Sequence, residues 1–166
     1  AYVESECIND EGLYRTGGQK SKVLGLYREA VKKNRAALLP EEDRMTVTSC
    51  LKYFLREVLP EPVIPMGADR EPWFDASSCE SELEMVAGFA QCVQDLHDSH
   101  RQILDAVLAH LQKVSRYSDT NKMTASNLGV VFGPTLLWST DTADLSKISK
   151  CNTVVGQLIE HYDQLM

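Results

Sequence analysis

The sequence predicts an all-α domain, because apolar residues recur at helical spacing along most of the chain and strand-like alternation is absent over any useful length. Its 166 residues fit one domain and can bury a sizeable core. Hydrophobic residues make up 43% and charged residues 25%, which are ordinary values for a globular protein. We therefore expect a single bundle of six or more helices over residues 1–166.

The first two expected helices each carry one apolar stripe. In residues 19–35 the stripe has the spacing i, i+3, i+4, i+7 and i+8, and consists of Val23, Leu26, Tyr27, Ala30 and Val31. In residues 46–59 it consists of Val47, Cys50, Leu51, Phe54, Leu55 and Val58. Pro40 lies beyond the first of these helices, and Pro60 ends the second.

The middle of the chain combines an irregular stretch with two helices. Residues 60–79 contain four prolines and are expected to be irregular or short helix. Ser81 and Glu84 have the spacing of a capping box, and the apolar positions of the helix that follows are Val86, Ala90 and Val93. Residues 99–116 carry the strongest helical pattern, namely Ile103, Leu104, Val107, Leu108, Leu111 and Val114.

Two further helices are expected toward the end of the chain. One runs from about Thr124 to Phe132 and stops at Gly133-Pro134, because proline lacks the N–H that continues a helix. In that helix Phe132 is expected to be a core aromatic. The last helix runs from about residue 152 to 165, on the apolar positions Val155, Leu158, Ile159 and Tyr162.

The charge distribution is uneven. A net charge of −7 argues against a general nucleic-acid-binding protein. Basic residues nevertheless concentrate between Arg15 and Arg56, where ten Lys or Arg stand against four Asp or Glu. Such a segment can face a negatively charged partner. Charge alone favours the simpler interpretation, a set of solvated helix faces.

The sequence lacks the motifs of a self-contained enzyme. It has no G-x-x-x-x-G-K-[ST] phosphate loop, no G-x-S-x-G elbow and no H-E-x-x-H pair, so we expect no cofactor of its own. His97 and His100 could share a helix face, but no third ligand accompanies them, so we expect no metal site. Five widely spaced cysteines predict reduced, intracellular thiols, with Cys50 and Cys92 as small core residues.

The sequence shows no membrane or secretion signal. No apolar run approaches the roughly 20 residues of a membrane helix. The acidic N-terminus lacks the basic and apolar regions of a signal peptide. We therefore expect a cytoplasmic domain without direct membrane insertion, cut from a longer protein whose other domains supply any membrane recruitment.

Three segments carry recognisable motifs: residues 11–18 read E-G-L-Y-R-T-G-G, residues 51–62 read L-K-Y-F-L-R-E-V-L-P-E-P, and residues 121–137 read N-K-M-T-A-S-N-L-G-V-V-F-G-P-T-L-L. In order and spacing they resemble the RhoGAP family signatures G-[IFL]-[FY]-R-x-x-G, L-K-x-x-L-R-x-L-P-E-P and N-x-M-T-x-x-N-L-A-x-V-F-G-P-x-L. Residues 148–153, I-S-K-C-N-T, are a weaker fourth match. The resemblance covers essentially the whole chain and implies a single RhoGAP-like bundle.

Two departures from the family pattern stand out. The second signature has one extra residue after Arg56, within residues 57–60, and we expect a slip in the following proline turn. The chain also begins close to the first motif, whereas the family has a further stretch of roughly two dozen residues upstream. The first helix of the bundle is therefore expected to be truncated.

Arg15 is the candidate catalytic residue. Gly12 before it and Gly17-Gly18 after it permit tight turns, so the arginine can project from a loop. A guanidinium is a planar, permanently charged set of donors that suits the charge developing in phosphoryl transfer. The resemblance implies that Arg15 is an arginine finger inserted into a partner; the alternative is an ordinary surface arginine.

Lys52 and Arg56 are four residues apart and share one face of their helix, at or beside its solvent edge. The resemblance implies that Lys52 contacts the partner GTPase and that Arg56 helps to hold the finger loop or the partner surface. The alternative is a pair of solubilising charges.

Two asparagines complete the candidate site. Asn127 lies among apolar residues, where an amide needs hydrogen-bond partners. The resemblance implies that Asn127 contacts the bound GTPase near its nucleotide and that Asn152 matches a second asparagine of the family. The alternative for Asn127 is a helix-capping or packing amide.

The resemblance implies an activator that binds a GTP-loaded Rho-family GTPase and accelerates GTP hydrolysis through Arg15, while the partner holds GTP and Mg²⁺. The chain would then be no enzyme alone. A second hypothesis is a catalytically weak or inactive module that only binds or scaffolds the GTPase. A third is a helical scaffold whose motif matches are accidental.

Overall fold

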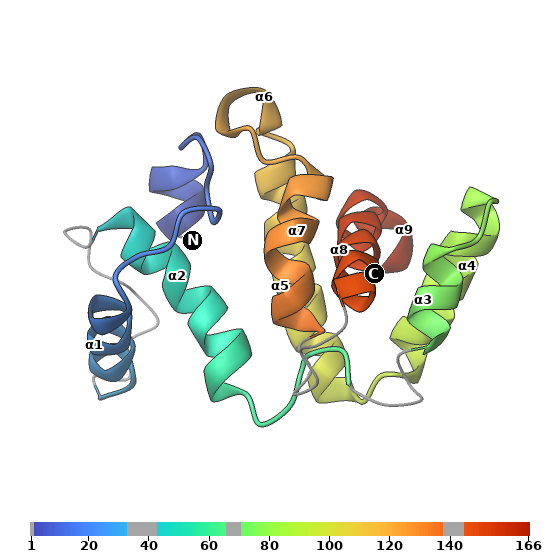
Figure 1. The fold of residues 1–166 in the computed structure, drawn as a ribbon, viewed down its shortest axis with the longest axis horizontal. Coiled ribbons are helices and arrows are strands. Elements are labelled where there is room, and N and C mark those ends of the chain that lie inside the picture. The colour runs from blue at the N-terminus through green and yellow to red at the C-terminus, as the bar shows by residue number, and fades with distance from the viewer. Residues whose placement is uncertain (1, 33–42, 66–70, 138–144) are drawn as a thin grey trace.

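The computed structural model describes residues 2–32, 43–65, 71–137 and 145–166, and within them it contains helices and turns but no strand. The expected all-α class is therefore confirmed (Figure 1). The elements are η1 (Val3–Cys7), α1 (Lys20–Lys32), α2 (Arg44–Tyr53), η2 (Phe54–Val58), α3 (Glu71–Ser77), α4 (Glu82–Asp95), α5 (Asp98–Ser115), α6 (Ser118–Asn121), α7 (Ala125–Leu136), α8 (Leu145–Glu160) and α9 (Tyr162–Leu165). The last turn expected for the first helix, and Pro40 after it, lie outside the described residues.

The bundle has a central group of helices with one layer on each side. Helices α5, α7 and α8 form the centre, where α7 packs most extensively on α8. Helices α1 and α2 lie on one side with η1, and α3 and α4 lie on the other (Figure 1). The core at the centre includes the fully buried side chains of Leu104, Leu108, Phe132, Leu136 and Leu158. Phe132 is thus confirmed as a core aromatic.

The helix expected over residues 46–59 is continuous but changes its winding. Asp43 caps its start by accepting a hydrogen bond from the backbone N–H of Thr46 at 3.2 Å. After α2 the chain continues as η2, a π-helical turn in which the Leu59 N–H donates to the Phe54 carbonyl at 3.2 Å. The widened turn contains one more residue than an α turn, so the extra residue is accommodated inside the helix, before the proline turn where the slip was expected.

The two predicted helices of the middle region are confirmed, and each has a side-chain cap. Ser81 accepts a hydrogen bond from the Glu84 N–H at 3.4 Å at the start of α4. His97 accepts one from the Ser99 N–H at 3.4 Å at the start of α5. The prolines before α4 separate it from α2, and Pro72 falls in the first turn of the short helix α3, where its missing N–H costs nothing.

The predicted stop at Gly133-Pro134 is wrong, because α7 continues through both residues to Leu136. A proline in a helix forfeits one backbone hydrogen bond at a cost of about 3 kcal/mol. Packing on α8 offsets this cost: a Cβ atom on Gly133 would lie only 2.8 Å from the Cα atom of Asn152. The last turn is also closed by the Leu137 N–H, which donates to the Gly133 carbonyl at 3.0 Å.

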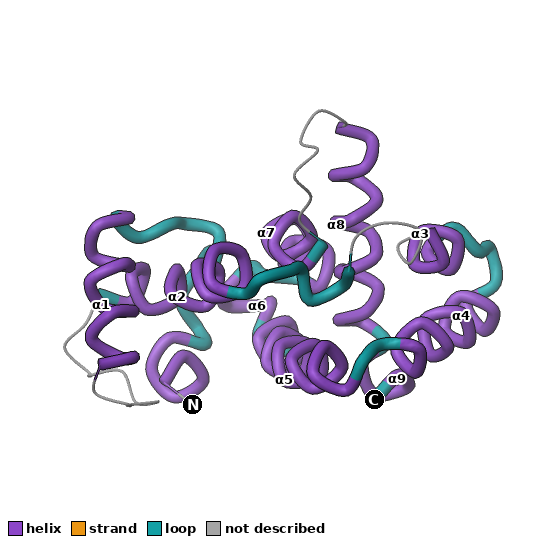
Figure 2. The backbone as a smooth tube through the Cα atoms, turned by 90° about the horizontal axis from the view of Figure 1, so that it is seen from below, coloured by secondary structure: helices purple, strands orange, loops and turns teal. Residues whose placement is uncertain are grey.

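The last predicted helix is present, but its bounds differ. Helix α8 begins at Leu145, ahead of the predicted residue 152, and a break at His161 separates it from α9. Its first part projects beyond α7 (Figure 2), and residues 147–150 are exposed. Polar exposed turns carry no apolar stripe, so periodicity alone detects only the packed part of such a helix.

Of the two cysteines expected in the core, Cys92 is buried and Cys50 is only half-buried. None of the five cysteines is in a disulfide, and the Cys50 Sγ lies 3.7 Å from the Val23 carbonyl. Among the described residues, no helix is long and apolar enough to cross a membrane.

Candidate functional site

The loop that carries Arg15 has an unusual backbone. Gly12 has φ 72° and Tyr14 has φ 71°, both in the left-handed region. Glycine adopts this region freely, whereas a residue with a Cβ atom does so at a cost of about 1–2 kcal/mol. The Arg15 N–H donates to the Gly12 carbonyl at 2.9 Å and closes the turn. Such a conformation persists only where surrounding contacts enforce it.

The side chain of Tyr14 is the main anchor of this loop. It is 2% exposed and lies edge-on to Phe132 of α7, with ring centroids 5.0 Å apart, and to His110 of α5 at 5.8 Å. Its hydroxyl lies 2.6 Å from His110 Nε2. The adjacent Arg15 is exposed. Burial of one residue thus presents its neighbour to solvent.

Lys52 holds the same loop from the other side. Its Nζ donates to the carbonyl oxygen of Tyr14. The side chain is half-buried, and this burial lowers the pKa of its ammonium group. Lys52 therefore lies half-buried beneath the loop of residues 12–18, called the finger loop below, and its expected contact with a partner stays a prediction.

Asn121 fixes the start of the loop, although sequence reasoning did not single it out. Its carbonyl accepts the Gly12 N–H at 2.8 Å. Its amide is fully buried and donates to the carbonyls of Ile8 at 2.8 Å and Val114 at 2.9 Å, and its Oδ1 accepts the Met123 N–H at 2.7 Å. The one available signal was its place at the head of the third motif.

Gly18 fixes the end of the loop on α2. Its N–H donates to the buried Ser49 Oγ at 2.8 Å. A Cβ atom on Gly18 would lie 2.7 Å from the Cα atom of Thr46, so only glycine allows this approach. The loop is therefore held at both ends and at Tyr14, and Arg15 lies between these points.

The guanidinium of Arg15 lies over its own loop. A Cβ atom on Gly12 would be 3.4 Å from Arg15 Nη2 and 3.5 Å from Nε, which is ordinary contact distance. The group is exposed, so its donors can turn toward an approaching anion.

Arg56 has a different environment from Lys52. Its side chain is 58% exposed, and its Nε lies 3.7 Å from Glu57 Oε1. An exposed pair of this kind contributes little to stability. Of the two roles expected for Arg56, holding the loop belongs to Lys52, while contact with a partner surface stays a prediction.

A short series of hydrogen bonds connects Asn127 to the finger loop. Its Nδ2 donates to the carbonyl of Lys122 at 2.8 Å, and Lys122 has φ 60°. Lys122 follows Asn121, whose carbonyl binds Gly12 as described above. The exposed Asn127 side chain thus fixes the turn before α7 and also faces solvent near the finger loop.

Asn152 lies elsewhere, in the seam between α7 and α8. A Cβ atom on Gly133 would be 2.6 Å from its Oδ1 atom, and that oxygen is buried without a hydrogen bond in the described part of the chain. Together with residues such as Ser126 and Thr153 it lines a hollow of about 330 Å³. None of its described contacts reaches the finger loop.

The two histidines considered as metal ligands have other partners. His97 caps α5, and His100 bonds the Val63 carbonyl at 2.9 Å and Glu61 at 3.0 Å. Within the described ranges, no group of three His, Cys, Asp or Glu side chains could hold a metal ion.

The basic segment is only partly a free surface. Arg44 Nη1 pairs with Asp10 Oδ1 at 2.8 Å, and Lys52 points into the loop. Its other basic residues within the described ranges are exposed, namely Arg15, Lys20, Lys22, Arg28, Lys32 and Arg56.

Comparison with protein families and curated proteins gives a consistent result. The RhoGAP domain model matches residues 1–141. The chain is 34% identical over 168 residues to the probable Rho-type GTPase-activating protein 4 of Schizosaccharomyces pombe, covering 99% of this chain and 17% of that protein. It is 36% identical over 169 residues to human Rho GTPase-activating protein 42, covering 98% of this chain and 19% of that protein. The chain thus spans about a fifth of the length of these relatives.

Two solved structures are similar to this chain in both fold and sequence. The crystal structure of the BH domain from GRAF, the GTPase regulator associated with focal adhesion kinase, superposes with a TM-score of 0.88 at 36% identity, covering 98% of this chain and 87% of that one. Human Rho GTPase activating protein 15 gives a TM-score of 0.88 at 27% identity, covering 99% of this chain and 79% of that one.

Proposed function

The chain belongs to the RhoGAP domain family, and on this premise we propose that it binds a GTP-loaded Rho-family GTPase in the cytoplasm and accelerates hydrolysis of the bound GTP. Arg15 supplies a guanidinium in trans, while the GTPase holds the nucleotide and Mg²⁺. The chain then acts on the active site of its partner and has none of its own.

The observation that carries this proposal is an exposed arginine on a loop with a fixed backbone. Tyr14 and Gly18 are held by contacts from α5, α7 and α2, while the Arg15 side chain stays free to reorient. Holding the backbone lowers the entropy cost of placing the guanidinium beside a transferring phosphoryl group. The planar donors of arginine then stabilise the charge that spreads over the phosphoryl oxygens.

Of the other candidate residues, one holds the loop, two face solvent and one lies between two helices. Lys52 supports Arg15 through the Tyr14 carbonyl. Arg56 and Asn127 are exposed, and we propose that they contact the GTPase surface. For Asn152 the contacts support packing between α7 and α8, and its contact with a partner stays a prediction.

A second candidate function is a module that binds the GTPase without accelerating hydrolysis. The observation that favours it is the π-helical turn Phe54–Val58, which includes Arg56. The widened turn changes the direction of side chains on a helix that we propose faces the partner.

A panel experiment separates these functions. Single-turnover phosphate release is measured from GTP-loaded Rho-family proteins, with and without this domain, alongside affinity for the same proteins carrying a non-hydrolysable GTP analogue. Acceleration with any member supports the activator and identifies its substrates. Tight binding to the GTP-analogue form without acceleration favours the binding module, and the absence of both contradicts each function.

A further inference from the structure

We propose that His110, supported by Glu4, is a positioning residue for the arginine finger: it holds the Tyr14 side chain and thereby fixes the backbone from which Arg15 projects. The inference deepens the proposed function and rests on it.

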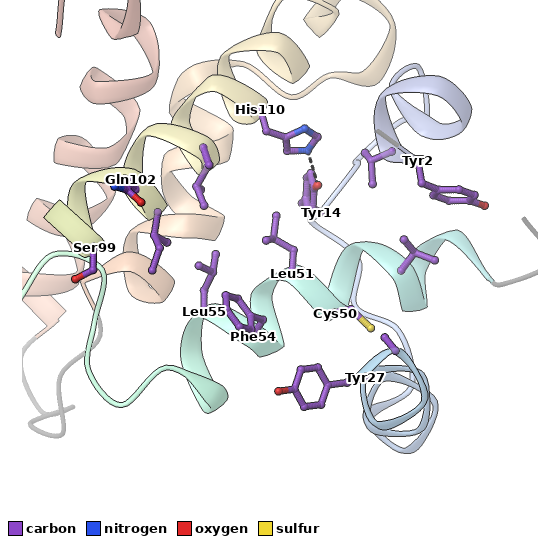
Figure 3. A pocket seen from close by; sticks show the side chains of 16 residues that line it. Tyr2, Tyr14, Tyr27, Cys50, Leu51, Phe54, Leu55, Ser99, Gln102 and His110 are labelled. Atoms are coloured by element: carbon purple, nitrogen blue, oxygen red, sulfur yellow. Dashed lines mark hydrogen bonds between the residues drawn. The ribbon is translucent and has the colours of Figure 1, made fainter. Parts of the chain in front are cut away.

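The three residues form one chain of hydrogen bonds across three elements. The Tyr14 hydroxyl of the finger loop lies 2.6 Å from His110 Nε2 on α5 (Figure 3). His110 Nδ1 lies 2.9 Å from Glu4 Oε1 on η1, and Glu4 Oε2 accepts from Lys113 Nζ at 2.7 Å. The finger loop is therefore tied to two elements that carry none of the proposed site residues.

Chemistry fixes the direction of these hydrogen bonds. Hydrogen bonds from Lys113 and His110 lower the pKa of Glu4 to about 2, so near neutral pH its carboxylate can only accept. His110 Nδ1 must then carry the proton that it donates. Burial lowers the pKa of His110 and favours the neutral ring, whose Nε2 is an acceptor. The Tyr14 hydroxyl then donates its hydrogen bond to that nitrogen, so both ring nitrogens of His110 have a partner.

The position of Tyr14 explains how this bond can act on Arg15. Its backbone is left-handed at φ 71°, and its side chain and its carbonyl are held from opposite directions, by His110 on α5 and by Lys52 on α2. Tyr14 lies between these two helices and lines an apolar groove of about 1050 Å³ (Figure 3). The hydroxyl bond to His110 adds a directional restraint to the edge-on packing of the ring on Phe132.

A merely structural hydrogen bond is the alternative, and the two roles predict different measurements. A structural bond contributes to the free energy of unfolding but leaves the rate of the folded complex unchanged. A positioning bond changes the maximal rate while the affinity for the GTP-state partner stays the same, because finger geometry matters most in the transition state.

The test compares Tyr14→Phe, His110→Leu and the double variant with the wild-type chain, on a GTPase that the wild type activates. We expect each single variant to lower the maximal single-turnover rate roughly three- to tenfold, about the net value of one hydrogen bond. The Kd for the GTP-analogue complex should change less than about twofold. The double variant should be no slower than the slower single variant, because both remove the same bond.

Two controls make the result specific. His110→Gln places an amide near the position of Nε2 and should restore most of the rate. Tyr162→Phe removes a similar hydroxyl bond, to Asp105 Oδ1 at 2.7 Å, at the C-terminal end of the chain, and should leave the rate unchanged. Tyr14→Phe removes a single oxygen, so it should fold even if His110→Leu does not.

The outcomes separate this inference from the proposed function. A wild-type maximal rate in folded Tyr14→Phe overturns the positioning role, while loss of activation in Arg15→Ala in the same assay would leave the finger assignment standing. A chain that activates no GTPase at all overturns both.

Discussion

At the scale of single residues, the site depends on side chains that hold a backbone more than on side chains that face solvent. Arg15 is exposed, but Tyr14, Lys52 and Asn121 bond or bury the chain on either side of it. Each of these three satisfies a polar group that would otherwise be costly to bury.

Asn121 tests this account through stability. In Asn121→Ala the carbonyls of Ile8 and Val114 and the N–H of Met123 all lose their partner inside the protein. We expect the free energy of unfolding to fall by about 2–4 kcal/mol. The matched control is Asn9→Ala, where an exposed amide loses one hydrogen bond from Thr120 and the loss should stay within about 0.5 kcal/mol. Urea denaturation of both variants checks this, and equal losses would contradict the assigned role.

His110 gives a prediction about pH. Burial lowers its pKa below 6.5, so the unfolded chain takes up the proton first as the pH falls. The stability contributed by neutral His110 is therefore complete above about pH 6.5 and is lost progressively below it. Within the described residues, Glu4, Lys113 and Tyr14 are titratable groups close to the ring. Glu4, with its pKa of about 2, stays ionised throughout this window.

Denaturation of the wild type and of His110→Gln, at about pH 7.5 and about pH 6, measures this effect. The wild type should lose more free energy of unfolding over this interval, since the three other histidines are the same in both proteins. An equal loss would mean that His110 is not buried in its neutral form.

At the scale of elements, side-chain caps marked two helix starts, whereas the end of α7 and the start of α8 were not predicted. The caps at Ser81 and Thr124 mark the starts of α4 and α7, because a cap bonds a backbone N–H two or three residues away. The ends depend on neighbours far along the chain. Gly133-Pro134 would stop an isolated helix, but α8 packs against this turn and α7 continues.

In the candidate site, too, local sequence patterns identified some residues and missed those whose partners are distant along the chain. Motifs identified Arg15, Lys52 and Asn127 from the sequence. His110 and Asn121 escaped notice because their partners Tyr14 and Ile8 are 96 and 113 residues away along the chain. Nothing in a local pattern encodes such distant contacts.

The α7–α8 crossing gives a prediction about glycine. A Cβ atom on Gly129 would lie 2.4 Å from the Asn152 carbonyl oxygen and 2.8 Å from the Gly156 nitrogen, and backbone atoms cannot move aside. We expect Gly129→Ala to cost about 2 kcal/mol or more. Gly25→Ala on α1 is the control: its Cβ would have open space within 4 Å, so the better helix propensity of alanine should add about 0.5–1 kcal/mol. Thermal denaturation of both variants checks this. A raised melting temperature in Gly129→Ala as well as in Gly25→Ala would contradict the close approach of α7 and α8.

The π-helical turn gives a prediction about length. Deleting Val58 leaves Lys52 and its bond to Tyr14 in place and lets Phe54–Val58 rewind as an α turn. We expect the shortened chain to fold, with a free energy of unfolding within about 1 kcal/mol of the wild type. Deleting Thr48 instead shifts Ser49 within α2 and breaks its bond to the finger loop, so a larger loss is expected. Unfolding of the Val58 deletion alone would show that η2 does not absorb the extra residue.

At the scale of the whole molecule, the finger loop lies where separate parts of the chain meet. It connects η1 to α1 and is bonded to α2, to α5 and to the last residue of α6 (Figure 1). Its geometry therefore depends on the assembled bundle. We thus expect activation to require the folded domain as well as Arg15, the residue that we propose contacts the phosphoryl group.

The most direct measurement is the single-turnover rate of GTP hydrolysis by a responsive Rho-family GTPase saturated with the wild-type domain, with Arg15→Ala and with Arg101→Ala. Arg101 is the matched control, an ion-paired arginine in the first turn of α5. We predict that Arg15→Ala lowers the single-turnover rate by a factor of about 10³–10⁵. Its affinity for the GTPase carrying a GTP analogue should largely persist. Arg101→Ala should behave as the wild type. Undiminished activation by Arg15→Ala would contradict the account.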